Sequence, residues 1–263
     1  MGLEYFISSV KDGNMDPRFG RVERSRKRFL RNAGIDNYVR MNAQNSDKIV
    51  TIGGDWHNIK GVECDVLFTK EKGLALECDP ADCAVYIMFN PIYNILGLIH
   101  AGREGSFKDI IEKAVDHGAK LSGVGINNFV PDLQVIVSPA ICFEHYRLDK
   151  LRLDNRVLRK WERYLYGELD LNRNNGFSNL VSSDGTKIMC NFLAYNRAVW
   201  NFMGIAVDNS NYVCTYESKD YFSHRRFSEQ KEKGGIKFAL WRVAGMIQKH
   251  KKEGRFMVAA RMV

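Results

Sequence analysis

The sequence predicts an α+β or α/β protein, with one domain built on a central mixed β-sheet and helices on its faces. Three observations support this class. Short apolar runs bounded by turn residues predict strands along much of the chain. Apolar residues three and four positions apart predict amphipathic helices among these strands. The 263 residues have an ordinary globular composition, 45% hydrophobic and 27% charged, and no shift in composition marks a domain boundary.

The first half of the chain is predicted to be mostly β-structure. Its expected strands are short runs rich in apolar, β-branched or aromatic residues, at Leu3–Val10, Lys48–Ile52, Val62–Thr69, Leu74–Cys78, Ala84–Phe89 and Ile95–Ile99. Turn signals such as Asp12-Gly13-Asn14 and Lys70–Gly73 separate some of them. The amphipathic segment Val22–Gly34 predicts a helix that ends at Gly34, because glycine commonly follows the last turn of a helix.

The second half is predicted to carry most of the helices. The i, i+3, i+4 apolar pattern predicts a helix at Phe107–His117, and the apolar run Asp132–Val137 predicts a strand. The Gly-, Asn- and Ser-rich segment Glu168–Thr186 predicts a loop. The remaining expected elements are helices at Leu148–Tyr166, Ile188–Met203 and within Glu229–Lys252, and a strand at Tyr212–Tyr216.

Charge and cysteine content narrow the classes of function. The net charge is +8, but basic residues are dense only at Arg21–Arg31 and Lys249–Arg255, which favours solvated basic faces over a nucleic-acid surface. A basic protein also attracts anionic substrates such as phosphate. No apolar run has the length of a membrane span, and Met1–Gly13 lacks the pattern of a signal peptide. The six cysteines form no CxxC pair, which predicts free thiols and a cytoplasmic location.

The stretch Cys78–Gly105 predicts a hairpin with two potential metal ligands at one end. Its two apolar runs are joined by a turn that contains Pro91. Cys83 precedes the first run and His100 follows the second, so antiparallel pairing would bring them side by side. A thiolate and an imidazole placed together could bind a soft or borderline metal such as zinc.

Several motifs, in order along the chain, resemble those of the YfiH or laccase-domain family. Pro80–Cys83 and His100-Ala101-Gly102 resemble the family core TADC…HAGWRG, and Cys214-Thr215 and Phe222–Arg226 resemble its CT and FFSYRR signatures. Further matches are Asn196-Arg197, Tyr146 and Gly254–Met257. The resemblance implies a single YfiH-like domain over residues 1–263, with insertions near 167–187 and 228–252.

The resemblance also implies a catalytic metal site made of His57, Cys83 and His100, with a fourth position open to water or substrate. His57 is matched to the histidine of the family's Q-V-H-G motif, although its neighbours differ. A lone cysteine or histidine is more often a core or surface residue, and it is the combination that favours a site. Zn²⁺ is the expected metal, and Cu²⁺ binds the same donors. Asp82 is expected to be structural, and Cys64 and Cys78 are expected to lie in the core.

Arg26, Arg225 and Arg226 are the expected phosphate-binding residues, because guanidinium groups suit phosphate oxygens, with surface arginines as the plainer alternative. In place of the family's HAGWRG, this chain has Arg103 and Glu104 after Gly102, which reverses one charge.

The resemblance implies a zinc-dependent purine nucleoside phosphorylase that converts adenosine or inosine to the free base and ribose 1-phosphate, with adenosine deamination as a further branch. The alternatives are a laccase-like copper polyphenol oxidase and a degenerate metal-binding protein without activity. The oxidase ranks lower because such enzymes need many histidine ligands and the chain has six histidines. The expected partners are a purine nucleoside and phosphate, with no nucleic acid and no membrane, in a monomer or small homo-oligomer.

Overall fold

The computed structural model describes residues 1–18, 22–149, 181–183, 187–190, 192–232 and 253–263. Their strands are β1 (Leu3–Ile7), β2 (Tyr38–Asn42), β3 (Ile49–Ile52), β4 (Gly61–Glu63), β5 (Val66–Thr69), β6 (Ala75–Cys78), β7 (Ala84–Asn90), β8 (Ile95–Ala101), β9 (Gln134–Val137), β10 (Arg147–Asp149), β11 (Val181–Ser183), β12 (Lys187–Cys190), β13 (Val207–Asp208) and β14 (Val258–Met262). The α-helices are α1 (Val22–Asn32), α2 (Arg103–Phe107), α3 (Ile110–Ser122), α4 (Ile126–Phe129) and α6 (Phe192–Phe202), and residues 224–232 are also helical. Single 3₁₀ turns occur at Val10–Asp12, Trp56–Asn58, Val130–Asp132 and Phe143–His145.

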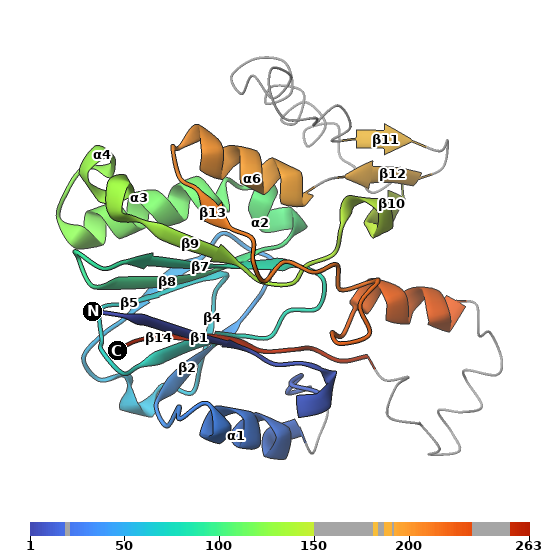
Figure 1. Cartoon of the computed structure of the whole chain (residues 1–263), viewed down its shortest axis with the longest axis horizontal. Coiled ribbons are helices and arrows are strands. Elements are labelled where there is room, and N and C mark those ends of the chain that lie inside the picture. The colour runs from blue at the N-terminus through green and yellow to red at the C-terminus, as the bar shows by residue number, and fades with distance from the viewer. Residues whose placement is uncertain (19–21, 150–180, 184–186, 191, 233–252) are drawn as a thin grey trace.

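Most strands lie in two stacked mixed sheets. The first has the order β1-β14-β6-β2-β4, and the second has the order β13-β9-β7-β8-β5-β3. Figure 1 shows α1 along the outer face of the first sheet and α3 and α6 along the outer face of the second. A small third sheet, β10-β12-β11, lies at one end of the molecule. The predicted class, mixed β-structure flanked by helices, is confirmed, and the strands divide between two large sheets.

Apolar side chains fill the layers on both faces of the second sheet. Along β7, Val85, Ile87 and Phe89 belong to the cluster between the two sheets. Tyr86 and Met88, which alternate with them, belong to the cluster that includes the buried residues of α3 and α6. A strand buried on both faces needs apolar residues at every position, which is why 84–89 reads as one continuous apolar run.

The predicted hairpin is confirmed. β7 and β8 pair antiparallel, with Val85 opposite His100 and Ala84 opposite Ala101. Turn residues 91–94 join them, and both strands are buried throughout. Cys83 and His100 therefore lie at the same end of the hairpin.

Some predicted boundaries are wrong. The expected strand Val62–Thr69 is divided near Asp65 between β4 in the first sheet and β5 in the second. The expected strand Tyr212–Tyr216 is a turn region with one isolated bridge, between Ala140 and Cys214. The expected helix start at Ile188 belongs to β12, and α6 begins at Phe192. β2 was not predicted, because Val39 and Met41 are its only buried apolar side chains.

Several expectations fall largely outside the described residues. Arg147–Asp149 forms β10 where a helix was expected to start, and the rest of that helix, 150–166, is not described. Of the expected loop, 181–183 forms β11. Of the expected helix within 229–252, residues 229–232 are helical. Among the described helices, none combines the length and hydropathy that a membrane span requires.

Candidate active site

A pocket of about 390 Å³, including space open to solvent, lies at the end of the β7–β8 hairpin. The hairpin contributes residues 82–84 and 101–103, and the segment after β9 contributes residues 140–143 and Tyr146. The first turns of α6 contribute Phe192, Leu193 and Asn196. The lining thus combines polar residues, among them Asp82, Cys83 and Asn196, with aromatic and aliphatic ones.

Cys83, which lines the pocket, lies beside His100, as the sequence predicts. The His100 side chain is buried, and its Nδ1 lies 2.9 Å from Oδ1 of the buried Asp65. Since Asp65 occupies Nδ1, Nε2 remains for Cys83 or a ligand. Burial by itself would lower the pKa of His100, but the neighbouring Cys83 and the bond to Asp65 outweigh it and raise this pKa to about 9.

Asp65 also organises the loop 44–46 that faces His100. Its carboxylate accepts backbone N–H groups of Gln44, Asn45 and Ser46 and the Ser46 hydroxyl, at 2.7–3.1 Å. Burial opposes ionisation of Asp65, but the hydrogen bonds from His100 and Ser46 prevail and lower its pKa. A buried ionised carboxylate therefore fixes both the imidazole and the loop, an arrangement typical of residues that support metal ligands.

Gly102 marks the point where three side chains converge. A Cβ atom at Gly102 would lie 3.2 Å from each of Asn45 Oδ1, Cys83 Sγ and His100 Cε1. The backbone of Gly102 has φ −74° and ψ 175°, which any residue adopts. Glycine is therefore needed here because a side chain would crowd its neighbours, and not because of the backbone conformation. The structure thus brings Asn45, which was not predicted, to the two residues that were.

His57, the expected third ligand, lies elsewhere. It belongs to the 3₁₀ turn Trp56–Asn58, is exposed, and stacks on the Trp56 ring at 3.9 Å between ring centroids. Among the described residues, no group of potential ligands joins His57 to Cys83 and His100. Its role as a ligand stays a prediction.

One sequence signal points to the loop at Asn45 instead. The family's Q-V-H-G motif follows a strand, and Gln44-Asn45-Ser46-Asp47 follows β2. When Gln44 is matched to the glutamine of this motif, Ser46 occupies the position of its histidine. The signal was missed because β2 itself was not predicted.

Arg26 and Arg226, two of the predicted phosphate-binding arginines, each bind several groups of the protein. Arg26 is 1% exposed; it forms ion pairs with Glu77 and Asp79, the latter at 2.6 Å, and donates to the Met15 carbonyl at 2.6 Å. Arg226 donates to four backbone carbonyls, those of Thr215, Tyr216, Ser218 and Tyr221. Their predicted role in phosphate binding stays untested, but both guanidinium groups stabilise chain segments.

The third predicted arginine, Arg225, and Arg103 lie near the pocket. The Arg225 guanidinium lies over the ring of Tyr146, a pocket residue, at 5.6 Å from its centroid. Arg103 lines the pocket itself, with one third of its side chain exposed, and bonds to Glu104 at 2.8 Å. Asp82, expected to be structural, accepts the Thr215 hydroxyl and the Arg225 backbone N–H, both at 2.7 Å.

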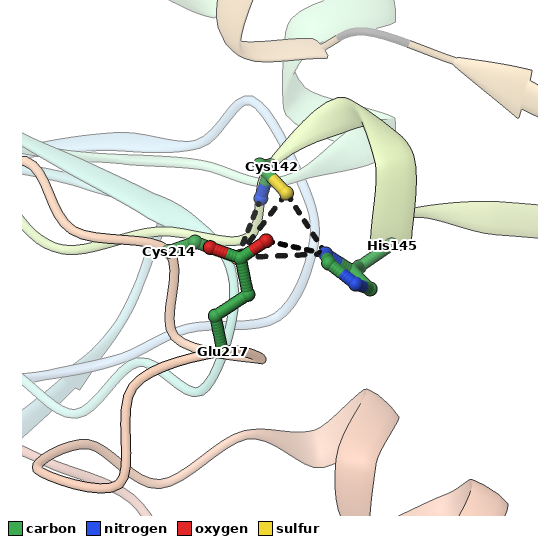
Figure 2. A group of neighbouring side chains, drawn as sticks. All are labelled: Cys142, His145, Cys214 and Glu217. Carbon is green, nitrogen blue, oxygen red and sulfur yellow. Dashed lines mark hydrogen bonds and ion pairs between the residues drawn. The ribbon is translucent and has the colours of Figure 1, made fainter.

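A second group of potential metal ligands consists of Cys142, which also lines the pocket, His145, Cys214 and Glu217 (Figure 2). One ligand atom from each residue lies within 4.8 Å of those of the other three. This group was not predicted, because its cysteines form no CxxC pair. The spacings Cys142-x-x-His145 and Cys214-x-x-Glu217 are nevertheless visible in the sequence. This set of donors suits a metal ion.

Comparisons with known proteins agree with the fold and the motifs. The family described as multi-copper polyphenol oxidoreductase laccase matches residues 12–243. A Campylobacter jejuni protein named purine nucleoside phosphorylase is 27% identical over 195 residues, which cover 73% of each chain. A Streptomyces griseus protein of the same name is 23% identical over 211 residues, 78% of this chain and 76% of that one.

Two solved structures share the fold. The hypothetical protein YfiH of Bacillus licheniformis superposes with a TM-score of 0.69 at 19% identity, covering 99% of this chain and 93% of that one. YlmD from Geobacillus stearothermophilus gives a TM-score of 0.68 at 20% identity, covering 100% and 91%. The family match spans most of the chain, so this protein belongs to the multi-copper polyphenol oxidoreductase laccase family and has the YfiH-type fold.

Proposed function

We propose that this protein is a purine nucleoside phosphorylase whose reaction takes place in the pocket beside Cys83 and His100. The observation that carries the proposal is the convergence of Cys83, His100 and Asn45 around Gly102, beside a pocket that Cys83 and Gly102 line, in a chain whose relatives bear the name purine nucleoside phosphorylase. In this reaction a phosphate oxygen bonds to the ribose anomeric carbon while the bond from that carbon to the purine nitrogen breaks. The purine leaves with the electron pair and takes up a proton.

The donors beside Gly102 fit a zinc ion in part. Cys83 and His100 are the donor types that zinc prefers, and the amide oxygen of Asn45 provides a third, weaker donor. Asp65 would orient His100 through Nδ1 and leave Nε2 toward the metal. A zinc ion in this place would supply Lewis-acid chemistry. We propose Asn45 in the position that the sequence analysis gave to His57.

The rest of the pocket supports binding of a nucleoside and phosphate. Phe143 and Tyr146 offer aromatic surface on which a purine could stack. Arg103 and Arg225 lie at or near the pocket and offer guanidinium groups for phosphate. Arg103 would then do the work of the family arginine from the neighbouring position, with Glu104 as its partner.

The activity test is an assay of the purified chain with adenosine or inosine, with and without phosphate. We expect free base and ribose 1-phosphate only when phosphate is present. Inosine formed from adenosine without phosphate would reveal the deaminase branch. Oxidation of a phenolic dye by the copper-loaded chain, with no purine turnover, would replace this proposal by the laccase-like one.

A pair of variants tests the assignment of the third ligand. Asn45→Ala should lower zinc content and turnover together, because a donor beside Gly102 is lost. His57→Ala is the matched control and should leave both unchanged, since His57 is exposed and stacks on Trp56. The reverse pattern would restore His57 as the ligand.

A further test concerns Arg103 and Glu104, which replace the Trp-Arg of the family motif. The double variant Arg103→Trp with Glu104→Arg restores that motif. Turnover should fall, since the guanidinium that lines the pocket is lost. A rise in turnover would show that Arg103 does not serve phosphate.

A further inference from the structure

A second ligand cluster lies on segments that carry no residue of the Cys83–His100 pair. We propose that Cys142, His145, Cys214 and Glu217 bind a Zn²⁺ ion of their own, through two thiolates, one imidazole and one carboxylate (Figure 2). The two thiolates distinguish this set from a cluster of surface acids. The inference does not depend on the reaction proposed above.

The spacing of the donor atoms is close to that of a tetrahedral zinc site. Zinc–sulfur bonds of about 2.3 Å and zinc–nitrogen bonds of about 2.0–2.1 Å place neighbouring donors about 3.3–3.8 Å apart. His145 Nδ1 lies 3.0 Å from Cys142 Sγ, 3.8 Å from Cys214 Sγ and 3.6 Å from Glu217 Oε1. The two sulfur atoms are 3.2 Å apart. The donor atoms of the remaining pairs lie within 4.8 Å of each other, so small side-chain movements would place one ion among all four.

Backbone pairing, and not the ligands themselves, brings the two segments together. The Ala140 N–H donates to the Val213 carbonyl and the Thr215 N–H to the Ala140 carbonyl, both at 3.1 Å. These bonds hold residues that are more than 70 positions apart in the sequence in one register. The site is therefore built before any ion arrives, which lowers the cost of binding.

Two further contacts hold the ligands in place. The His145 ring stacks on the Tyr216 ring, with centroids 4.2 Å apart and an interplanar angle of 17°. Arg226 Nη1 donates to the carbonyls of Thr215, Tyr216 and Ser218, which frame the turn between Cys214 and Glu217. Ligands fixed in this way by packing and hydrogen bonds are typical of a preorganised site.

The test uses the full chain, stripped of metal and then reloaded with Zn²⁺ or Co²⁺. His145→Ala should weaken binding at this site at least about 100-fold, since even residues behind a ligand contribute about 10–100-fold to affinity. Elemental analysis should show about one zinc fewer per chain. His224→Ala is the matched control, because that histidine is 61% exposed and pairs with Glu253. It should retain the full metal content.

Two more variants keep the test decisive if removal of His145 disturbs folding. Glu217→Gln changes a side chain that is 64% exposed, so the fold should persist while zinc affinity falls. Cys142→Ser with Cys214→Ser should remove thiolate-to-Co²⁺ absorption from this site and leave that of Cys83. Unchanged zinc content in these folded variants would overturn the proposal. A Cys142–Cys214 disulfide, with no metal gained after reduction, would also overturn it and identify a redox pair.

Discussion

The Thr215 hydroxyl donates a hydrogen bond of 2.7 Å to the carboxylate of Asp82. Thr215 directly follows Cys214, and Asp82 directly precedes Cys83. This one buried contact therefore joins the segments that carry the two candidate metal sites. The other oxygen of Asp82 accepts the backbone N–H of Arg225 at 2.7 Å, so the carboxylate ties three distant segments together.

Replacing Thr215 by Val should destabilise the fold by about 1.5–3 kcal/mol, because a hydrogen bond to a buried charged group is lost. Thr215 is 0% and Asp82 6% exposed, so water cannot readily replace the hydroxyl. Denaturant unfolding at pH 7 measures the change. Thr51→Val is the control; Thr51 is an exposed strand residue whose hydroxyl lies 2.8 Å from His117 Nε2, where water can replace it, so its replacement should stay within about 0.5 kcal/mol. Equal effects of the two variants would contradict this account.

Replacing Gly102 by Ala should impair the site without unfolding the protein. The new Cβ would lie 3.2 Å from Asn45 Oδ1, Cys83 Sγ and His100 Cε1, tighter than an ordinary contact, so these side chains must move. We expect zinc affinity and turnover to fall by about 10-fold or more. Gly125→Ala is the matched control: Gly125 also precedes a helix with φ −70°, and nothing lies within 4 Å of its Cβ position. Wild-type metal content in the Gly102 variant would place the site elsewhere.

Replacing Arg26 by Ala should destabilise the fold, because the buried side chains of Glu77 and Asp79 both lose their partner; the loss should be about 3–5 kcal/mol above about pH 6, where Asp79 is ionised. The apparent affinity of the folded fraction for phosphate should not change. Arg24→Ala, an exposed position on the same helix, serves as control and should have little effect. A stable Arg26 variant with weakened phosphate affinity would instead support the role predicted from the sequence.

The same cluster predicts how stability depends on pH. Burial raises the pKa of Glu77 from 4.5 to about 8, against the opposing effect of Arg26, and raises that of Asp79 from 3.8 to about 6. The folded state therefore holds protons that the unfolded chain has released. The stabilisation that comes from protonated Glu77 and Asp79 is fully present below about pH 4 and is lost as the pH rises to about 8. The free energy of unfolding therefore falls with rising pH in this window.

Glu77→Gln removes the main titrating group and should flatten this slope, by at most about 1.4 kcal/mol per pH unit. The measurement is a series of denaturant unfolding curves between pH 5 and pH 8. Glu63→Gln, at an exposed position, should retain the slope of the wild type. A wild-type slope that rises with pH would show that Glu77 and Asp79 are both ionised beside Arg26.

The sequence by itself determined the features that rest on local pattern. The apolar runs on either side of Pro91 specified the hairpin, and a short turn leaves two such strands one way to pair. Cys83 and His100 had to meet for that reason. Cys64 and Cys78 were correctly assigned to the core, where both are fully buried. The class of fold followed from the alternation of strands and helices.

Only the tertiary structure decided which distant residues share a place. Asn45 reaches Cys83 because Asp65 binds its loop, and Cys142 reaches Cys214 because Ala140 pairs with the backbone beside it. The sequence pattern around Arg26 is that of a surface helix, whereas in the folded protein two carboxylates pack around its guanidinium group. Periodicity and turn residues record only short-range geometry. Contacts across tens of residues depend on how both sheets and their helices pack together, and no local pattern in a single sequence specifies that packing.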